Sequence, residues 1–460
     1  MKILKTQNKA KLTLCAGAAA LAALAPQAHA QSSDALIDKL EAKGILTADE
    51  AKDLRAESDK DFKTALQAKT GMPDWVTGWK IYGDFRGRFE QFSATDNEHF
   101  VNRQRERYRL RFGITASIID NMEVGFRLTS ADNASAPPGT SPSYTTQGNP
   151  NSDNTTLQNN FTKKGVFIET AYAKWTAINS GDWLLAATIG KMDNPFNFTW
   201  MVFDPDLTPE GGAITGAYTI NDQHSIAFTG AAFVLDEEAA STRDPFLYGG
   251  QILLNSKWTD KVSSSVGFGA LDIVNPQQLT TANVPYQNQG NTRTAGGVLA
   301  YSYYPIIADA SVTYKLESFP LYPGEFPVKV GAEYMYNPGV GQDNVGFWLG
   351  ATLGKSGHKG TWDISYRYEY LEADAWYDQM EDDDNVAFYQ NANAAHSVFT
   401  GAFSGTNVKG HLVRFNYSIT DYLTLSLTGY LTSLIDQNLN GNNEPHSQLA
   451  HVMADLTWKF

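Results

Sequence analysis

The chain has 460 residues, with 36 Lys and Arg against 50 Asp and Glu and a formal net charge of −14. A protein whose main partner is nucleic acid carries a basic excess, so this charge argues against that partner. A single cysteine excludes a disulfide scaffold and a thiolate metal cluster. No uncharged apolar stretch of 18 residues follows position 30, which excludes a bundle of transmembrane helices. The mean hydropathy of −0.34 resembles that of a soluble protein.

Residues 1–30 have the pattern of an export signal. Four lysines precede an apolar run from Leu12 to Ala25, and Ala28-His29-Ala30 follows as an A-x-A cleavage site. The apolar run is too short to span a bilayer, which argues against an anchor. Cleavage after Ala30 would remove the only cysteine and change the net charge from −14 to −18. We therefore expect an exported protein of a Gram-negative envelope.

Residues 31–73 form the only segment with a helical pattern. Leu36, Ile37 and Leu40 recur at helical spacing, and Thr47 with Glu50 predicts a capping box that opens a second helix. One interpretation is an amphipathic helix pair that packs on its own chain. The other is a periplasmic element for oligomerisation or for contact with the cell wall through residues 31–70. The pattern does not decide between them.

From residue 74 to residue 460 the chain alternates apolar and polar residues with period two, which is typical of strands. Aromatic residues gather near strand ends, and the segments are about as long as a tilted bilayer crossing, which favours a transmembrane barrel over a soluble sandwich. We predict an all-β barrel of sixteen antiparallel strands, an even number as in bacterial barrels. The expected strands are 77–92, 104–118, 121–131, 164–178, 182–191, 213–221, 224–235, 247–258, 261–271, 306–317, 326–337, 343–354, 360–372, 407–419, 422–434 and 448–460.

Connections alternate between short and long along this series. The short ones all follow even-numbered strands, so they lie at one end of the barrel, which we expect to be periplasmic. The long segments, including 132–163, 192–212, 272–305 and 373–406, are then extracellular. The last residue, Phe460, follows alternating apolar residues, as in the assembly signal of outer-membrane barrels.

Arginines dominate the polar side of the first three expected strands. Residues two apart in a strand face the same way, and the apolar residues occupy the other parity, so these side chains should face a watery lumen. Arginines on the lipid face would cost about 2–4 kcal/mol each. The predicted channel-lining residues are Arg86, Arg88, Arg105, Arg107, Arg109, Arg111 and Arg127, with Arg103 at the loop end. They could conduct anions, or they could pair with neighbouring glutamates and brace the wall.

The segment 192–212 is unusually aromatic for an exposed loop. Such side chains favour burial, so we expect it to fold into the lumen as a constriction, with its carboxylates facing the arginines. A surface loop that binds a partner is the alternative. The expected constriction residues are Asp193, Phe196, Trp200, Asp204, Asp206 and Glu210.

The stretches Ile189–Phe196 and Phe203–Gly211, the helical segment and the Arg107/Arg109/Arg111 strand resemble the putative porin family of Gram-negative outer membranes. That family is similar to the general and phosphate-selective sixteen-stranded porins. The resemblance implies a homotrimer in outer-membrane lipid that passes small hydrophilic solutes by passive diffusion, without naming a solute. The lysine-rich ladder of the phosphate porins is replaced by arginine. We expect a preference for anions, and no cofactor, catalytic residue or resident metal.

Two other functions stay open at this stage. An outer-membrane hydrolase would need a Ser/His pair, for which His411 and His451, expected on polar strand faces, are the candidates. A structural anchor between outer membrane and cell wall through residues 31–70 could coexist with a pore. The run Asp382-Asp383-Asp384 in the loop 373–406 is interpreted as a solvated charge run, with a Ca²⁺ site as the alternative.

Overall fold

The structure is a computed structural model. It describes residues 37–58, with gaps at 44, 48–49 and 56, and residues 73–460, with gaps at 96–101, 134–146, 240, 282, 286–289, 390–400 and 438–447. The chain divides into two compact units, residues 1–77 and 78–460. The expected signal peptide lies outside the described residues.

The first unit contains two short helical stretches, residues 37–42 and 50–55. The predicted capping box is present, because the backbone N–H of Thr47 donates to the Glu50 carboxylate at 2.9 Å and the backbone N–H of Glu50 donates to the Thr47 hydroxyl at 3.3 Å. Arg55 joins the two stretches through Asp38 at 2.6 Å and Glu41 at 3.0 Å. A short helical segment therefore precedes the barrel. None of the described helices is long and apolar enough to cross a membrane.

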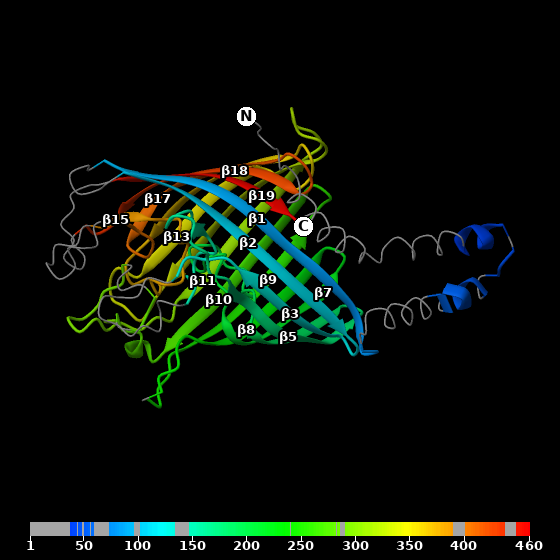
Figure 1. The fold of residues 1–460 in the computed structure, drawn as a ribbon, viewed down its shortest axis with the longest axis horizontal. Helices are drawn as coiled ribbons and strands as arrows, with labels where there is room; N and C mark the ends of the chain where they lie inside the picture. The colour runs from blue at the N-terminus through cyan, green and yellow to red at the C-terminus, as the bar shows by residue number, and fades with distance from the viewer. Residues whose placement is uncertain are drawn as a thin grey trace, which may run out of the picture. The chain divides into compact units, whose positions relative to one another are not determined.

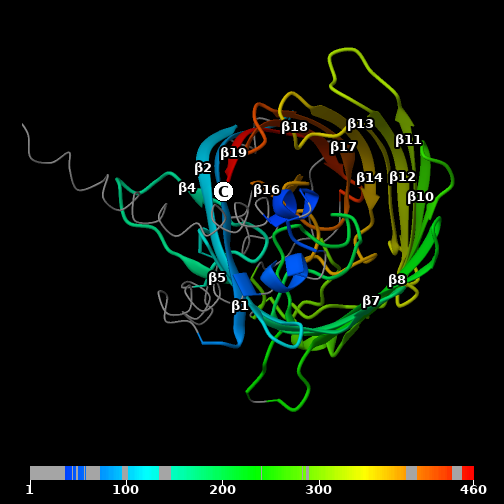
Figure 2. The same cartoon turned by 90° about the vertical axis from the view of Figure 1, so that its right-hand side faces the viewer.

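The second unit is a closed antiparallel barrel (Figures 1 and 2). Sixteen long strands pair with their chain neighbours, and β1 pairs with β19 to close the ring. A two-residue strand, β4 (Thr155–Thr156), pairs with β2, and β15 (Ala387–Tyr389) and β16 (Gly401–Phe403) form a separate two-stranded sheet. The sixteen strands are β1 (Val76–Ala94), β2 (Arg103–Ile118), β3 (Met122–Thr129), β5 (Phe167–Ser180), β6 (Trp183–Lys191), β7 (Glu210–Asn221), β8 (His224–Val234), β9 (Phe246–Lys257), β10 (Val262–Val274), β11 (Ile306–Leu316), β12 (Phe326–Tyr336), β13 (Val345–Gly354), β14 (Trp362–Leu371), β17 (Val408–Ser418), β18 (Leu423–Leu434) and β19 (Leu449–Lys459).

The period-two pattern sorts side chains between the two faces of this barrel. On β10, Val266 and Phe268 are 52% and 56% exposed on the outer face, whereas Gly267 and Gly269, which alternate with them, face inward and are covered. The exposed outer residues are apolar and aromatic all around the ring, as lipid contact requires. The sequence-based prediction of a sixteen-stranded transmembrane barrel is confirmed.

Tight turns join successive strand pairs at one end, which we call the short-turn end. Between β2 and β3, Asp120 and Asn121 have φ of 60° and 58°, as a type I′ turn requires. The opposite end, the long-loop end, carries the segments 130–166, 192–209, 275–305 and 372–407. The inner faces near this end are mostly buried, while those near the short-turn end are more exposed.

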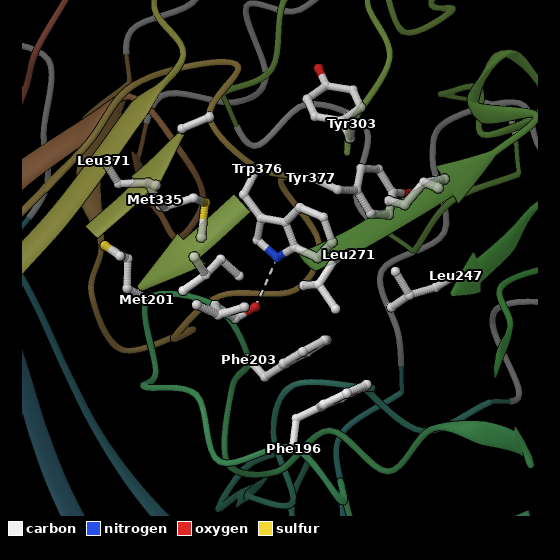
Figure 3. Packing of buried hydrophobic residues seen from close by; sticks show 14 of the residues in the cluster. Phe196, Met201, Phe203, Leu247, Leu271, Tyr303, Met335, Leu371, Trp376 and Tyr377 are labelled. Carbon is white, nitrogen blue, oxygen red and sulfur yellow. Dashed lines mark hydrogen bonds between the residues drawn. The ribbon is translucent and has the colours of Figure 1, made fainter. Parts of the chain in front are cut away.

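A hydrophobic cluster explains that burial. Trp376, from the 372–407 segment, is fully buried and lies close to Phe203, Met335, Leu271 and Tyr377 (Figure 3). The cluster combines inward residues of the strands with residues of three long segments. The core of this barrel therefore lies inside it, at the long-loop end.

Candidate channel interior

The predicted arginines lie on the inner face of neighbouring strands. Arg86 and Arg88 belong to β1, Arg127 belongs to β3, and the other four belong to β2. Outward residues between them, such as Leu110 and Phe112, are 44% and 40% exposed. We call these seven arginines the arginine wall: Arg86, Arg88, Arg105, Arg107, Arg109, Arg111 and Arg127.

Carboxylates on the strands themselves pair with much of the arginine wall. Glu90, which is fully buried, lies 2.9 Å from Arg105 and 3.4 Å from Arg107. Asp84 lies 2.9 Å from Arg109 and 2.7 Å from Arg111.

Two further strand carboxylates continue the pattern. Glu169 of β5 lies 2.6 Å from Arg127, and Asp455 of β19 lies 2.8 Å from Arg88. Arg86 instead donates to the side-chain oxygen of Asn154 at 2.7 Å and forms no ion pair with a described residue. The arginine wall is therefore braced by ion pairs, the alternative that sequence reasoning left open.

The segment 192–209 crosses the barrel interior. It leaves β6 and returns to β7, and between them its backbone reaches strands further round the ring. The N–H of Asn197 donates to Gln251 of β9 at 2.8 Å, and the N–H of Thr199 donates to Glu333 of β12 at 3.2 Å. The ring of Trp200 then lies 4.2 Å from the Arg414 guanidinium and 5.3 Å from that of Arg367.

The ring order shows how far this segment extends. Counting sixteen long strands from β1, β6 and β7 are the fifth and sixth, so the strands directly opposite are the thirteenth and fourteenth, β14 and β17. Arg367 belongs to β14 and Arg414 to β17. The segment thus spans the ring from one side to the other.

The aromatic residues of the segment are buried inside the barrel, as their composition indicates. Phe196 and Phe203 are 8% and 7% exposed, and their rings stack with centroids 6.0 Å apart. Phe203 meets Trp376 edge to face at 6.1 Å, and the indole N–H of Trp376 donates to the Val202 carbonyl at 2.8 Å (Figure 3). Through these contacts with Trp376, the segment 192–209 packs against a second segment of the chain.

That second segment, residues 372–386, also lies within the barrel interior. Asp384 pairs with Arg88 at 3.1 Å, and Asp382 pairs with Arg367 at 3.1 Å and accepts the Tyr430 hydroxyl at 3.0 Å. Asp382 is 3% exposed. The interpretation of Asp382–Asp384 as a solvated charge run is therefore wrong, because the hydrophobic residues that precede it draw the carboxylates inward.

The carboxylates of the 192–212 segment differ in their partners. Asp193 lies 2.5 Å from Arg127, and Asp206 lies 3.3 Å from Arg109. Glu210 instead pairs with Lys191 at 3.0 Å, because both belong to the β6–β7 ladder, so it does not face the arginine wall as expected. Asp204 accepts backbone N–H groups of Asp206 and Asp383 at 2.6 and 2.9 Å.

These loop carboxylates have opposite pKa shifts. Burial raises the pKa of Asp204, and the nearby carboxylates of Asp383, Asp206 and Asp382 raise it further. Burial also acts to raise the pKa of Asp206, but Arg109, Arg86 and Arg111 outweigh it, so that pKa is lowered. The segment therefore carries one carboxyl group that favours its neutral form and one that favours its charged form.

Oxygen atoms of Asp204, Asp382 and Asp383 lie within 4.8 Å of one another, a spacing that suits a hard cation. However, Asp204 accepts two backbone N–H groups, and Asp382 pairs with Arg367, so two of the three groups already have partners. The contacts explain this cluster without a metal.

The two histidines proposed for a hydrolase lie on opposite faces. His411 of β17 is exposed on the outer face with Val413 and accepts or donates a hydrogen bond with the Tyr366 hydroxyl at 2.9 Å. His451 is buried on the inner face, with its Nε2 3.2 Å from Glu90. The expectation that both lie on polar faces was wrong for His411, because the alternation of β17 directs Arg414 inward and residue 411 outward.

Sequence reasoning missed Arg367 and Arg414 as partners of the crossing segment. Both occupy inward positions, between outward residues such as Tyr366 and Val413. The alternation could have placed them on the inner face, but only the ring order places them opposite β6 and β7.

An apolar outer face, a charged inner face and closure of sixteen strands define a membrane-spanning β-barrel with a polar interior. Residues 96–301 match the model of the family described as putative porin, which confirms the resemblance seen in the sequence. The family match and the barrel place the protein in the Gram-negative outer membrane and support a channel for passive diffusion as its class of activity.

No curated protein matches the chain. Among solved structures, it is similar to the high-pH structure of OprB from Pseudomonas putida, with 9% identity, 87% of this chain and 97% of that chain covered, and a TM-score of 0.48. It is also similar to OmpF of Salmonella typhi in complex with daunomycin, with 10% identity, coverage of 83% and 97%, and a TM-score of 0.45. A mutant porin of Rhodopseudomonas blastica matches with 10% identity, coverage of 83% and 100%, and a TM-score of 0.39.

Proposed function

We propose that this protein is a general porin for small hydrophilic solutes, and that the segment 192–209 narrows its lumen. The observation that carries this proposal is the crossing of that segment from β6 and β7 to Arg367 and Arg414 on the opposite strands. A segment that touches both sides of the ring divides the lumen and limits the size of a solute. The segment 372–386 adds to the narrowing, since Asp384 pairs with Arg88.

We also propose a modest preference for anions. Guanidinium groups stay charged at any physiological pH, and seven of them line one wall. Their ion pairs cancel most of this charge, so the preference should be weak. A pore with an open row of arginines would instead be strongly selective.

Planar-bilayer recording tests the proposal. The purified, folded protein should show stepwise conductance. In a KCl gradient, its reversal potential should have the sign expected when chloride is more permeant than potassium. A folded protein without stepwise conductance would refute the porin function, while cation selectivity would refute only the charge preference. Neutral solutes of graded size, followed by liposome swelling, should show a sharp size limit set by the crossing segment.

The remaining expectations are proposals of the same kind. We propose that residues 1–30 are removed on export, that the barrel forms a homotrimer in outer-membrane lipid, and that the short-turn end faces the periplasm. The helical segment 31–73 would then lie on the periplasmic side, where it could contact the cell wall. Native mass measurement of the detergent-solubilised protein tests trimerisation, and a mass of one chain would refute it.

A further inference from the structure

The arginine wall is poorly placed to act on a passing solute. Arg88, Arg107 and Arg109 are 6%, 5% and 8% exposed, and the segments 192–209 and 372–386, which we call the crossing segments, both touch the wall directly. Asp384 pairs with Arg88 and Asp206 pairs with Arg109, at 3.1 and 3.3 Å. These contacts leave no water layer between the paired groups. The field that a solute meets must therefore come largely from other residues.

A cavity of about 580 Å³ lies against the inner wall at the short-turn ends of β7–β12. Every residue of its lining has a polar side chain, and eight of its fifteen residues are serines or threonines. Such a surface binds water and small hydrogen-bonding solutes without holding them strongly. This cavity, which we call the hydroxyl vestibule, has the character of a permeation path.

Among the described residues, Lys329 is the exposed lysine of the hydroxyl vestibule that forms no ion pair, and Asp222, in the β7–β8 turn, is the one carboxylate of the lining. It lies on the inner face of β12, between the outward Val328 and Val330, and pairs in register with Thr313 and Thr352. In the described part of the chain it forms no ion pair. Lys257, the other lysine of the vestibule, pairs with Asp260 at 3.0 Å. Asp309 of β11 interacts with Lys329 electrostatically, but from beyond ion-pair distance.

We infer that solutes pass along the hydroxyl vestibule and that Lys329 contributes more to the preference for small anions than the ion-paired arginine wall does. This inference rests on the proposed porin function and assigns its charge selectivity to a residue. An ammonium group about 7 Å from the path, screened at 0.15 M salt, enriches anions about 1.5-fold. Reversal of that charge should therefore lower the ratio of chloride to potassium permeability about two- to five-fold.

The test compares Lys329→Glu with Lys174→Glu in bilayers at 0.15 M salt. Lys174 lies on the inner face of β5, beside the arginine wall and outside the vestibule, so it is a matched control. We expect the Lys329 variant to show the full change in permeability ratio and the control to show less than half of it. Asp309→Asn should raise the anion preference, because it removes the opposing charge.

An equal or larger change in the control would overturn the inference while leaving the porin function intact. Absence of conductance in the folded wild type would instead remove the porin function itself. If Lys329→Glu does not fold, Lys329→Cys replaces it, since the only native cysteine, Cys15, lies in residues 1–30, which we propose are removed on export. A negatively charged thiol reagent should then lower the permeability ratio and a positively charged one should restore it. No difference between the two reagents would also overturn the inference.

Discussion

Trp376→Ala should release the two crossing segments from each other. The side chain is fully buried, its indole N–H donates to the Val202 carbonyl at 2.8 Å, and its ring meets Phe203 edge to face. A buried Trp removes about 150–250 Å² from water, which corresponds to roughly 4–6 kcal/mol. Measured Trp or Phe to Ala changes in cores cost about 3–5 kcal/mol, because the site partly collapses. We therefore expect the docked arrangement to lose about 3–5 kcal/mol.

The assay for this variant must distinguish release of the two segments from unfolding of the barrel. The barrel closes through backbone pairing of β1 with β19, which does not involve Trp376. Heat-modifiable migration on SDS gels should therefore stay close to that of the wild type. Cleavage by protease within the segments 192–209 and 372–386 should become faster, and single-channel conductance should rise and become noisier.

Trp175→Ala is the control for this experiment. Trp175 is 51% exposed on the outer face of β5 and does not belong to the interior cluster. It should change neither cleavage nor conductance noise. If Trp376→Ala behaves like this control, the hydrophobic cluster does not hold the segments inside the barrel, and our account of the narrowing is wrong.

Three further predictions follow from single contacts. Burial and the carboxylate of Asp384 raise the pKa of Asp383 well above its usual range, so the docked segment holds a proton that a released segment loses. Docking of the segment 372–386 in the barrel should weaken as pH rises from about 4 through that raised pKa. The rate of protease cleavage within the segment, measured against pH, reports this, and Asp383→Asn should remove part of the pH dependence. Glu90→Gln should lower barrel stability by about 3–5 kcal/mol, because buried arginines lose their partner; an unchanged midpoint in denaturant would contradict this. Thr47→Ala should cost about 1 kcal/mol of helix stability, seen as faster hydrogen exchange after residue 50, with no change in conductance.

The barrel could be predicted from sequence because its signal is local and repeated. Each strand shows its own alternation, and pairing with chain neighbours then follows without further information. The type I′ turn at Asp120 and Asn121 likewise depends on residues that are adjacent in sequence. The helical segment was predictable for the same reason, since the bonds between Thr47 and Glu50 join residues three apart.

The interior could be predicted only in part, because its contacts join residues far apart in the chain. The aromatic composition of 192–212 indicated burial, and that segment does lie inside. The segment 372–386 gave a misleading signal, since its run of aspartates is typical of solvated loops. Trp376 and Tyr377, shortly before that run, were the only local indication of burial.

The net charge of the whole chain says little about the lumen for a related reason. Arg88 pairs with Asp384 and Asp455, which follow it by about three hundred residues or more. Each pair removes one positive and one negative charge from the field that a solute meets, whatever the totals are. Lys329 matters because it lacks such a pairing in the described residues. Ion selectivity in this barrel therefore depends on which charges remain unpaired. A small number of unpaired positive charges in the lumen can give an anion preference although the net charge of the whole chain is −14.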